Sequence, residues 1–175
     1  MDGRIVNGPR GNAGAIGSMP IGLPLAETRL NVNTPAQLLQ LASGWQLEQA
    51  LMQEGIDPLL VQEDIIMDAQ YHKLTQPWLA RASQALAMST TSASALLDID
   101  VVLVDGSLSP KLMHALIEQT EASLAHFSFD GIHRPKVLAG HVGSHARALG
   151  GALLPLHAHF FPDKDIFLKQ DAAVN

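Results

Sequence analysis

The fold class of this chain is decided by the stretch VVLVDGSLSP, residues 101–110. Its first four residues form an uninterrupted β-branched and apolar run, which is typical of a strand buried on both faces in a parallel sheet. Ser109 and Pro110 then supply a helix N-cap and a first helical residue, so we expect a helix from there to about Phe127. A buried strand that leads into a helix indicates an α/β protein.

The chain repeats this pattern towards its C-terminus. Residues 135–139 are expected to form a second short strand, residues 140–143 a loop, and residues 144–160 an apolar helix that ends before Pro162. The order strand, helix, strand, helix predicts a right-handed crossover unit over about residues 98–162.

A helical segment is predicted over residues 34–97, ahead of this unit. Thr34 as N-cap, Pro35 as first helical residue and Gln37 at the reciprocal position of a capping box predict a helix that Gly55 ends.

Two further helices are expected in the same segment. They cover about residues 58–69 and 71–97, and Pro77 interrupts or restarts the second. The small residues of the stretch 89–95 indicate close packing of that helix against another element.

Residues 1–33 are rich in glycine and proline, so we expect a strand end followed by a loop. Residues 4–6 look like the tail of a strand that enters an Asn-Gly turn. The glycines at a three-residue spacing between Gly8 and Gly17 are too few for a collagen-like helix. Together with the helical segment and the crossover unit, this segment is expected to complete a single domain over residues 1–175.

The composition excludes several classes of protein. With 175 residues, 47% of them hydrophobic and 16% charged, the chain is expected to form one globular core. The 11 basic and 17 acidic residues give a net charge of 11 − 17 = −6, which argues against binding to the phosphate backbone of DNA. The lack of cysteine excludes disulfides, thiolate zinc sites and cysteine nucleophiles, and it fits a reducing cytoplasm. No apolar run approaches the about 20 residues of a membrane span, so no membrane partner is expected.

Two stretches carry residues with possible chemistry. The glycine-rich loop of residues 8–18 is either a plain connector or a surface that offers backbone N–H groups to an anion or a sugar hydroxyl. Asp105 follows the strand of residues 101–104, and ligands of open α/β sheets lie at such carboxyl ends. Its carboxylate could bind a ribose, bind a magnesium-bridged phosphate, or cap the following turn.

The eight histidines do not predict a metal site. The nearest pairs are His141 with His145 and His157 with His159, and no carboxylate accompanies either pair at short range. We interpret these histidines as solvent-facing or hydrogen-bonded structural residues.

Three segments, taken in order, resemble one family, the ROK proteins (repressors and sugar kinases). Residues 11–19, GNAGAIGSM, resemble the family's G-x-A-G-E-I-G-H loop. Residues 97–109 resemble its "LLDPEVVVIGGGLS" strand and turn, and residues 141–156 resemble its closing helix. The resemblance implies the C-terminal lobe of an actin-like, RNase H-like ATPase fold, with several helices packed on a small sheet.

The resemblance also implies where ligands would bind. The sugar side would involve Gly11, Asn12, Gly14 and Ser18, and the nucleotide-side turn would involve Asp105, Gly106 and Ser107. In the family, an N-terminal lobe supplies the aspartate that acts as base and a glycine-rich phosphate loop, and repressors carry a winged helix before that lobe. These parts are expected to lie outside the present sequence.

The chain departs from the family's pattern at the ligand positions. Ala15 and Ser18 stand where family kinases have the glutamate and histidine that bind sugar, and the next family glutamate falls near Leu39. The cysteine-rich zinc motif is absent, and Asp105 replaces a glycine of the nucleotide-side turn. These departures favour the zinc-less regulators of the family over its kinases, because a kinase needs such groups to orient its substrate.

The sequence therefore predicts the effector and dimerisation half of a ROK transcriptional regulator of carbohydrate metabolism, without catalysis or cofactors. The alternatives are a fragment of an ATP-dependent ROK sugar kinase, which would use ATP and magnesium, and a structural or interaction module. We expect a cytoplasmic homo-oligomer with a possible sugar ligand, which contacts DNA only through an N-terminal segment outside this sequence.

Overall fold

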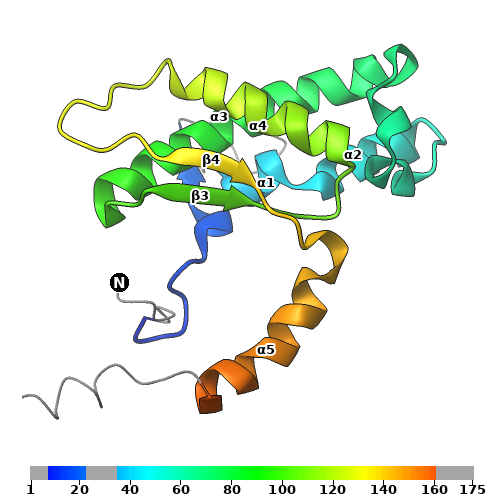
Figure 1. Ribbon diagram of the computed structural model, residues 1–175. Helices are drawn as coiled ribbons and strands as arrows, with labels where there is room; N and C mark the ends of the chain where they lie inside the picture. The colour runs from blue at the N-terminus through cyan, green and yellow to red at the C-terminus, as the bar shows by residue number, and fades with distance from the viewer. Residues whose placement is uncertain (1–7, 23–34, 161–175) are drawn as a thin grey trace, which may run out of the picture. The chain divides into compact units, whose positions relative to one another are not determined.

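The computed structural model describes residues 8–22 and 35–160 of the chain (Figure 1). The chain separates into two compact units, Met1–His141 and Val142–Asn175. The described part of the second unit is a short 3-10 helix, η5 (Gly143–His145), followed by helix α5 (Ala146–Phe160). This confirms the predicted closing helix, and α5 continues through Pro155.

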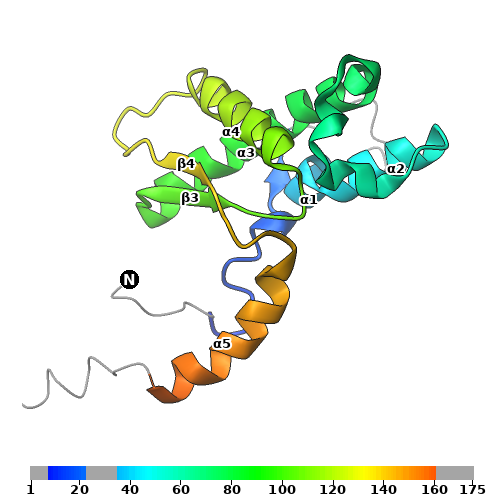
Figure 2. The same ribbon diagram turned by 45° about the vertical axis from the view of Figure 1, so that its right-hand side comes forward.

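The predicted strand, helix, strand pattern is confirmed in the first unit. Strands β3 (Val101–Val104) and β4 (Lys136–Ala139) pair in parallel, with Val101 opposite Lys136 and Val104 opposite Ala139. Helix α4 (Pro110–Leu124) connects them (Figures 1 and 2). The side chain of Ser109 caps α4 as predicted, because its Oγ accepts a hydrogen bond from the Leu112 N–H at 3.2 Å.

The prediction that β3 is buried on both faces is wrong. Val102 and Val104 pack with β4 residue Val137 against Ala87 of helix α3 (His72–Leu97) and Leu124 of α4. On the opposite face the apolar side chains are exposed, at 43% for Val101, 68% for Leu103 and 46% for Leu138. A continuous apolar run shows that both faces suit burial, and it does not show whether both are covered.

Glu121 of α4 fixes the outer edge of β4. The N–H groups of Lys136 and Gly140 donate to carbonyls of β3 and its flank, so the N–H of Val137 between them points away from β3. Glu121 Oε1 accepts from that N–H at 2.8 Å, and its Oε2 accepts from Arg134 at 3.1 Å. One carboxylate thus joins α4 to an edge strand that would otherwise expose an unpaired donor.

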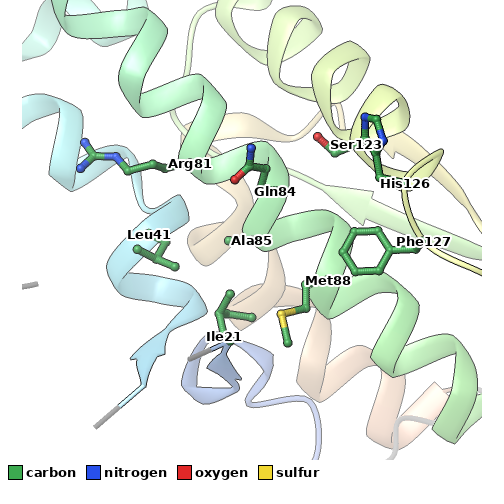
Figure 3. A pocket seen from close by; sticks show the side chains of 10 residues that line it. Ile21, Leu41, Arg81, Gln84, Ala85, Met88, Ser123, His126 and Phe127 are labelled. Atoms are coloured by element: carbon green, nitrogen blue, oxygen red, sulfur yellow. The ribbon is translucent and has the colours of Figure 1, made fainter. Parts of the chain in front are cut away.

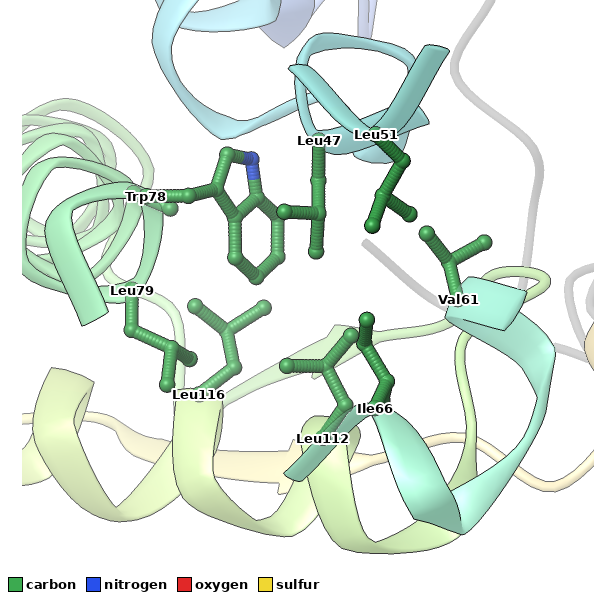
Figure 4. Close-up of a cluster of buried hydrophobic side chains, with 9 residues drawn as sticks. Leu47, Leu51, Val61, Ile66, Trp78, Leu79, Leu112 and Leu116 are labelled. Atoms are coloured by element: carbon green, nitrogen blue, oxygen red, sulfur yellow. The ribbon is translucent and has the colours of Figure 1, made fainter. Parts of the chain in front are cut away.

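The main core lies where the helices meet, beside the sheet (Figure 4). Its buried residues come from helix α2 (Gly44–Gln53), from the 3-10 helices η2 (Pro58–Gln62) and η3 (Asp64–Met67), from α3 and from α4. They are Leu47, Leu51, Val61, Ile66, Trp78, Leu79, Ala82, Leu112 and Leu116. The indole N–H of Trp78 donates to the Ser43 carbonyl at 3.0 Å, so the one polar group of the largest core side chain has a hydrogen-bond partner.

The first predicted helix begins later than expected and has a break. Thr34 lies outside the described residues, and strand β2 (Ala36–Gln37) pairs antiparallel with β1 (Pro20–Ile21). Helix α1 (Leu38–Ala42) starts after Gln37, which is the N-cap of a capping box with Gln40. Ser43 then ends α1 and caps α2.

The helix predicted at about residues 58–69 is wrong in type. The structure has three short 3-10 helices there, η2, η3 and η4 (Ala69–Tyr71). Glu63 and Asp68 lie between them in extended conformation and prevent a continuous α-helix.

Helix α3 does not break at Pro77, which the sequence offered as an interruption. Pro77 lies in the second turn of α3, and its carbonyl accepts from Arg81 Nε at 3.3 Å. The predicted close packing is confirmed, because Ser89, Thr90, Ala93 and Ser94 of α3 are all buried.

Candidate functional site

The glycine-rich loop is a series of tight turns that requires its glycines. Gly8, Gly11 and Gly14 have φ of +68°, +70° and +84°, which residues with a Cβ rarely adopt. The loop ends in the 3-10 helix η1 (Ile16–Ser18). Several of its N–H groups are used internally: that of Gly11 donates to the Gly8 carbonyl and that of Ser18 to the Ala15 carbonyl. The described loop is therefore held in a defined conformation by its own turns and hydrogen bonds.

The four predicted sugar-side residues, Gly11, Asn12, Gly14 and Ser18, lie on this one loop and are all exposed. The amide of Asn12 and the hydroxyl of Ser18 are the polar side chains among them. Amide and hydroxyl groups both donate and accept hydrogen bonds, so these two side chains have the chemistry that a sugar hydroxyl requires.

Leu39 of α1 lies directly beside η1. A Cβ placed on Gly17 would be 3.5 Å from the Leu39 Cβ and 3.9 Å from its Cδ1, and the Leu39 side chain is 61% exposed. An exposed isobutyl group therefore stands next to the loop at the position where the family resemblance implies a carboxylate. Leucine cannot accept hydrogen bonds from a sugar.

The loop is tied to the helices through β1. The Leu38 N–H donates to the Met19 carbonyl at 2.9 Å, and Ile21 pairs with Ala36. Ile21 and Leu38 are buried with Ala85 of α3 in a second apolar cluster, against which Met19 packs. The position of the loop is thus set by α1 and α3.

The predicted nucleotide-side turn lies at the carboxyl ends of the two parallel strands. Asp105 follows β3, and its Oδ1 accepts from the Gly106 N–H at 2.8 Å. Capping of the following turn is one of the roles that the sequence analysis gives for Asp105, and ligand binding is the alternative. Ser107 is exposed and Gly106 is half-buried, so the turn is accessible.

The Asp105 carboxylate lies against Gly140, the residue after β4. A Cβ on Gly140 would come within 2.6 Å of the Asp105 Cβ and Cγ and within 2.7 Å of Oδ2. The carboxylate adds negative charge and bulk at the strand ends, where a phosphate would otherwise approach backbone N–H groups. A phosphate here would need a bridging cation, because like charges repel.

A groove that sequence reasoning missed runs along α3 (Figure 3). Its volume is about 620 Å³, and it is lined by residues of β1, α1, α3 and the end of α4. Four separate elements form it, so no local motif could have indicated it.

The histidine pairs form no metal cluster in the part of the chain that the structure describes, which holds no group of three His, Asp or Glu side chains placed for a cation. His141 and His145 are exposed, and the side chains of His157 and His159 lie outside the described part. Among the described helices, none has the length and apolar character needed to cross a bilayer.

Comparison with known proteins gives a consistent result. The model of the ROK family matches residues 1–158. A ROK hexokinase from Thermus thermophilus superposes with a TM-score of 0.56 at 22% identity, over 86% of this chain and 49% of that one. A ROK family protein from Streptococcus pneumoniae TIGR4, solved in complex with sucrose, gives 0.62 at 20% identity, over 89% and 52%. No curated protein matches by sequence. The chain spans about half the length of both solved relatives.

Proposed function

Because this chain belongs to the ROK family and has its actin-like α/β fold, we propose that it is the effector and dimerisation half of a ROK transcriptional regulator of carbohydrate metabolism. The observation that carries this proposal is the position of Leu39 beside η1. An apolar side chain at the sugar loop removes a hydrogen-bond acceptor that phosphoryl transfer to a sugar would use for positioning.

In this proposal the sugar loop acts as a sensor of weak affinity. Asn12 and Ser18 hydrogen-bond sugar hydroxyls, and the turns at Gly11 and Gly14 hold these two side chains in place. DNA is contacted through an N-terminal segment outside this sequence, since the net charge of −6 does not favour a phosphate backbone. The regulator acts in the cytoplasm and needs no cofactor.

Self-association belongs to the same proposal. Val101, Leu103 and Leu138 expose an apolar sheet face, and apolar faces of this kind are typical of protein interfaces. In the described part of the chain β3 pairs only with β4, so the sheet also has an edge available for a second copy.

A second candidate function is a sugar kinase fragment, and the position of Asp105 favours it. A carboxylate at the carboxyl ends of two parallel strands is a suitable magnesium ligand, and magnesium would bridge it to ATP phosphates. Asp105, Gly106 and Ser107 would hold the nucleotide side in that case. A third candidate, an interaction module without either ligand, is separated from both by the following experiment.

The test combines sugar binding with detection of ADP. Calorimetry with a panel of hexoses and amino sugars is expected to give weak, millimolar binding that Asn12→Ala abolishes and Gln53→Ala, an exposed amide on α2, leaves unchanged. Leu39→Glu is expected to tighten binding about tenfold or more by restoring an acceptor, since a hydrogen bond to a charged group contributes about 1.5–3 kcal/mol and about 1.4 kcal/mol corresponds to tenfold in affinity.

A coupled assay for ADP separates the kinase from the regulator. The regulator proposal expects no sugar-dependent ADP release from this chain. Release that disappears in Asp105→Ala would establish the kinase instead. Absence of both sugar binding and ADP release, including in Leu39→Glu, would favour the interaction module.

A further inference from the structure

The groove along α3 has the size and composition of a small-molecule site. Its volume of about 620 Å³ lies within the range of about 300–1,000 Å³ that is usual for ligand pockets. In Figure 3, α3 forms its floor, Ile21 and Leu41 come from β1 and α1, and Phe127 comes from the end of α4.

The apolar part of the groove suits a flat hydrocarbon body. Ala85 is buried and presents only a methyl group, which leaves room above the helix, and Met88 and Phe127 are half-buried beside it. A thioether and an aromatic ring adapt well to another ring system. These side chains would lose water on binding such a body, which supplies the main attraction.

The polar part of the groove favours an anion. Arg81 lines the groove, and among the described residues its one hydrogen bond runs from Nε to the Pro77 carbonyl at 3.3 Å, which leaves its two terminal amino groups for solvent or a ligand. None of the described lining residues is acidic. Gln84 of α3 adds an amide to the groove, and Ser123 and His126 add groups that can donate hydrogen bonds on the side opposite Arg81 (Figure 3).

The spacing along α3 sets the length of the ligand. Arg81 and Met88 are seven residues apart, which corresponds to roughly 10 Å along a helix. Figure 3 shows Arg81 on one side of the groove and Ser123, His126 and Phe127 on the other. A molecule of two fused or linked rings with a terminal acid group spans this distance.

We propose that this groove binds an organic anion with an apolar or aromatic body, held at its charged end by Arg81 and along its body by Ala85, Met88 and Phe127. The inference stands apart from the proposed function, because it uses neither the sugar loop nor the nucleotide-side turn. It places a second ligand on β1 and α3, the elements that anchor the sugar loop.

The test uses two fluorescent probes of matched shape and different charge. Anilinonaphthalene sulfonate carries the acid group, and phenylnaphthylamine has the same rings without it. We expect saturable binding of the sulfonate with one site per chain. Arg81→Gln is expected to weaken it about tenfold, since hydrogen bonds to charged groups contribute strongly, and to change binding of the neutral probe less than about twofold.

Two control variants keep the result specific. Lys73→Gln removes an exposed cation from the same helix outside the groove, and Leu103→Ser alters the exposed sheet face, a second apolar surface that could attract the dye. Both are expected to leave the sulfonate affinity unchanged, and circular dichroism checks that all variants fold.

Three results would overturn the inference. One is an absence of saturable binding by the folded protein. Another is an equal loss of affinity in Arg81→Gln and Lys73→Gln, which would indicate general charge attraction. The third is a loss confined to Leu103→Ser, which would place the dye on the sheet face.

Discussion

Asp105 and Gly140 lie side by side at the carboxyl ends of β3 and β4, so closely that residue 140 has no space for a Cβ. The two residues are neighbours because the parallel register sets Val104 opposite Ala139 and the Gly140 N–H donates to the Val104 carbonyl at 2.8 Å. The glycine at 140 is thus required by the aspartate at 105, and not by an unusual φ of its own.

Gly140→Ala is therefore expected to destabilise the protein by about 1–3 kcal/mol, the usual cost of overpacking. The added methyl group would meet the Asp105 Cβ at 2.6 Å, and that atom cannot move without the backbone. Asp105→Gly in the same chain is expected to restore most of the loss. Urea unfolding of the single and double variants measures the coupling, and Gly106→Ala, which has open space around it, is the control.

Asp98 ends α3 in the left-handed conformation, with φ of +49°. Replacement by glycine is expected to raise the free energy of unfolding by about 0.5–1 kcal/mol, because the relief of backbone strain exceeds the added entropy of the unfolded chain. Asp98→Val should lower it by a similar amount. Asp100→Gly, at a position without a positive φ, should not stabilise the protein, and a gain there would contradict the explanation.

Glu121 is expected to matter for stability through its backbone contact. Glu121→Ala leaves the Val137 N–H without its acceptor and should cost about 1–3 kcal/mol, whereas Glu121→Gln keeps an amide oxygen and should cost less. Thermal unfolding followed by circular dichroism measures both. Glu118→Ala, exposed on the same helix, should have little effect, and an equal loss there would point to helix propensity instead.

The exposed sheet face is expected to drive self-association. Leu103→Ser should shift the sedimentation profile towards monomer without lowering the unfolding temperature, because the side chain is 68% exposed in the single chain. Leu59→Ser, at 62% exposure on η2, is the matched control. A compact monomer for the unmodified chain at tens of micromolar would contradict the prediction.

The elements that the sequence predicts well are those that local chemistry determines. Ser109 and Pro110 start α4 because a cap and a first helical residue act within one turn. Helix α1 begins later than predicted because Ala36 pairs with Ile21, a contact that no window around Thr34 contains. Burial is mispredicted for a similar reason. The side chains of Val101 and Leu103 suit a covered sheet face, but the described part of the unit leaves them exposed.

The candidate site likewise has a part that the sequence predicts and parts that it does not. The loop from Gly11 to Ser18 was found because glycines at left-handed positions leave a signal in the sequence. The contact of Asp105 with Gly140 depends on strand register, and the groove depends on four elements meeting, so neither leaves such a signal.

The carboxylate of Glu121 at the outer edge of β4 also limits what assemblies of this chain can be. At Val137 the outward N–H is already bound to a side chain, so in the described part of the chain the open edge of this sheet is that of β3. A sheet with one open edge can pair once with the sheet of a second copy, whereas a sheet with two open edges can add copies without limit. In the homo-oligomer proposed above, Glu121 thus favours a closed pair of β3–β4 sheets over an open series of them.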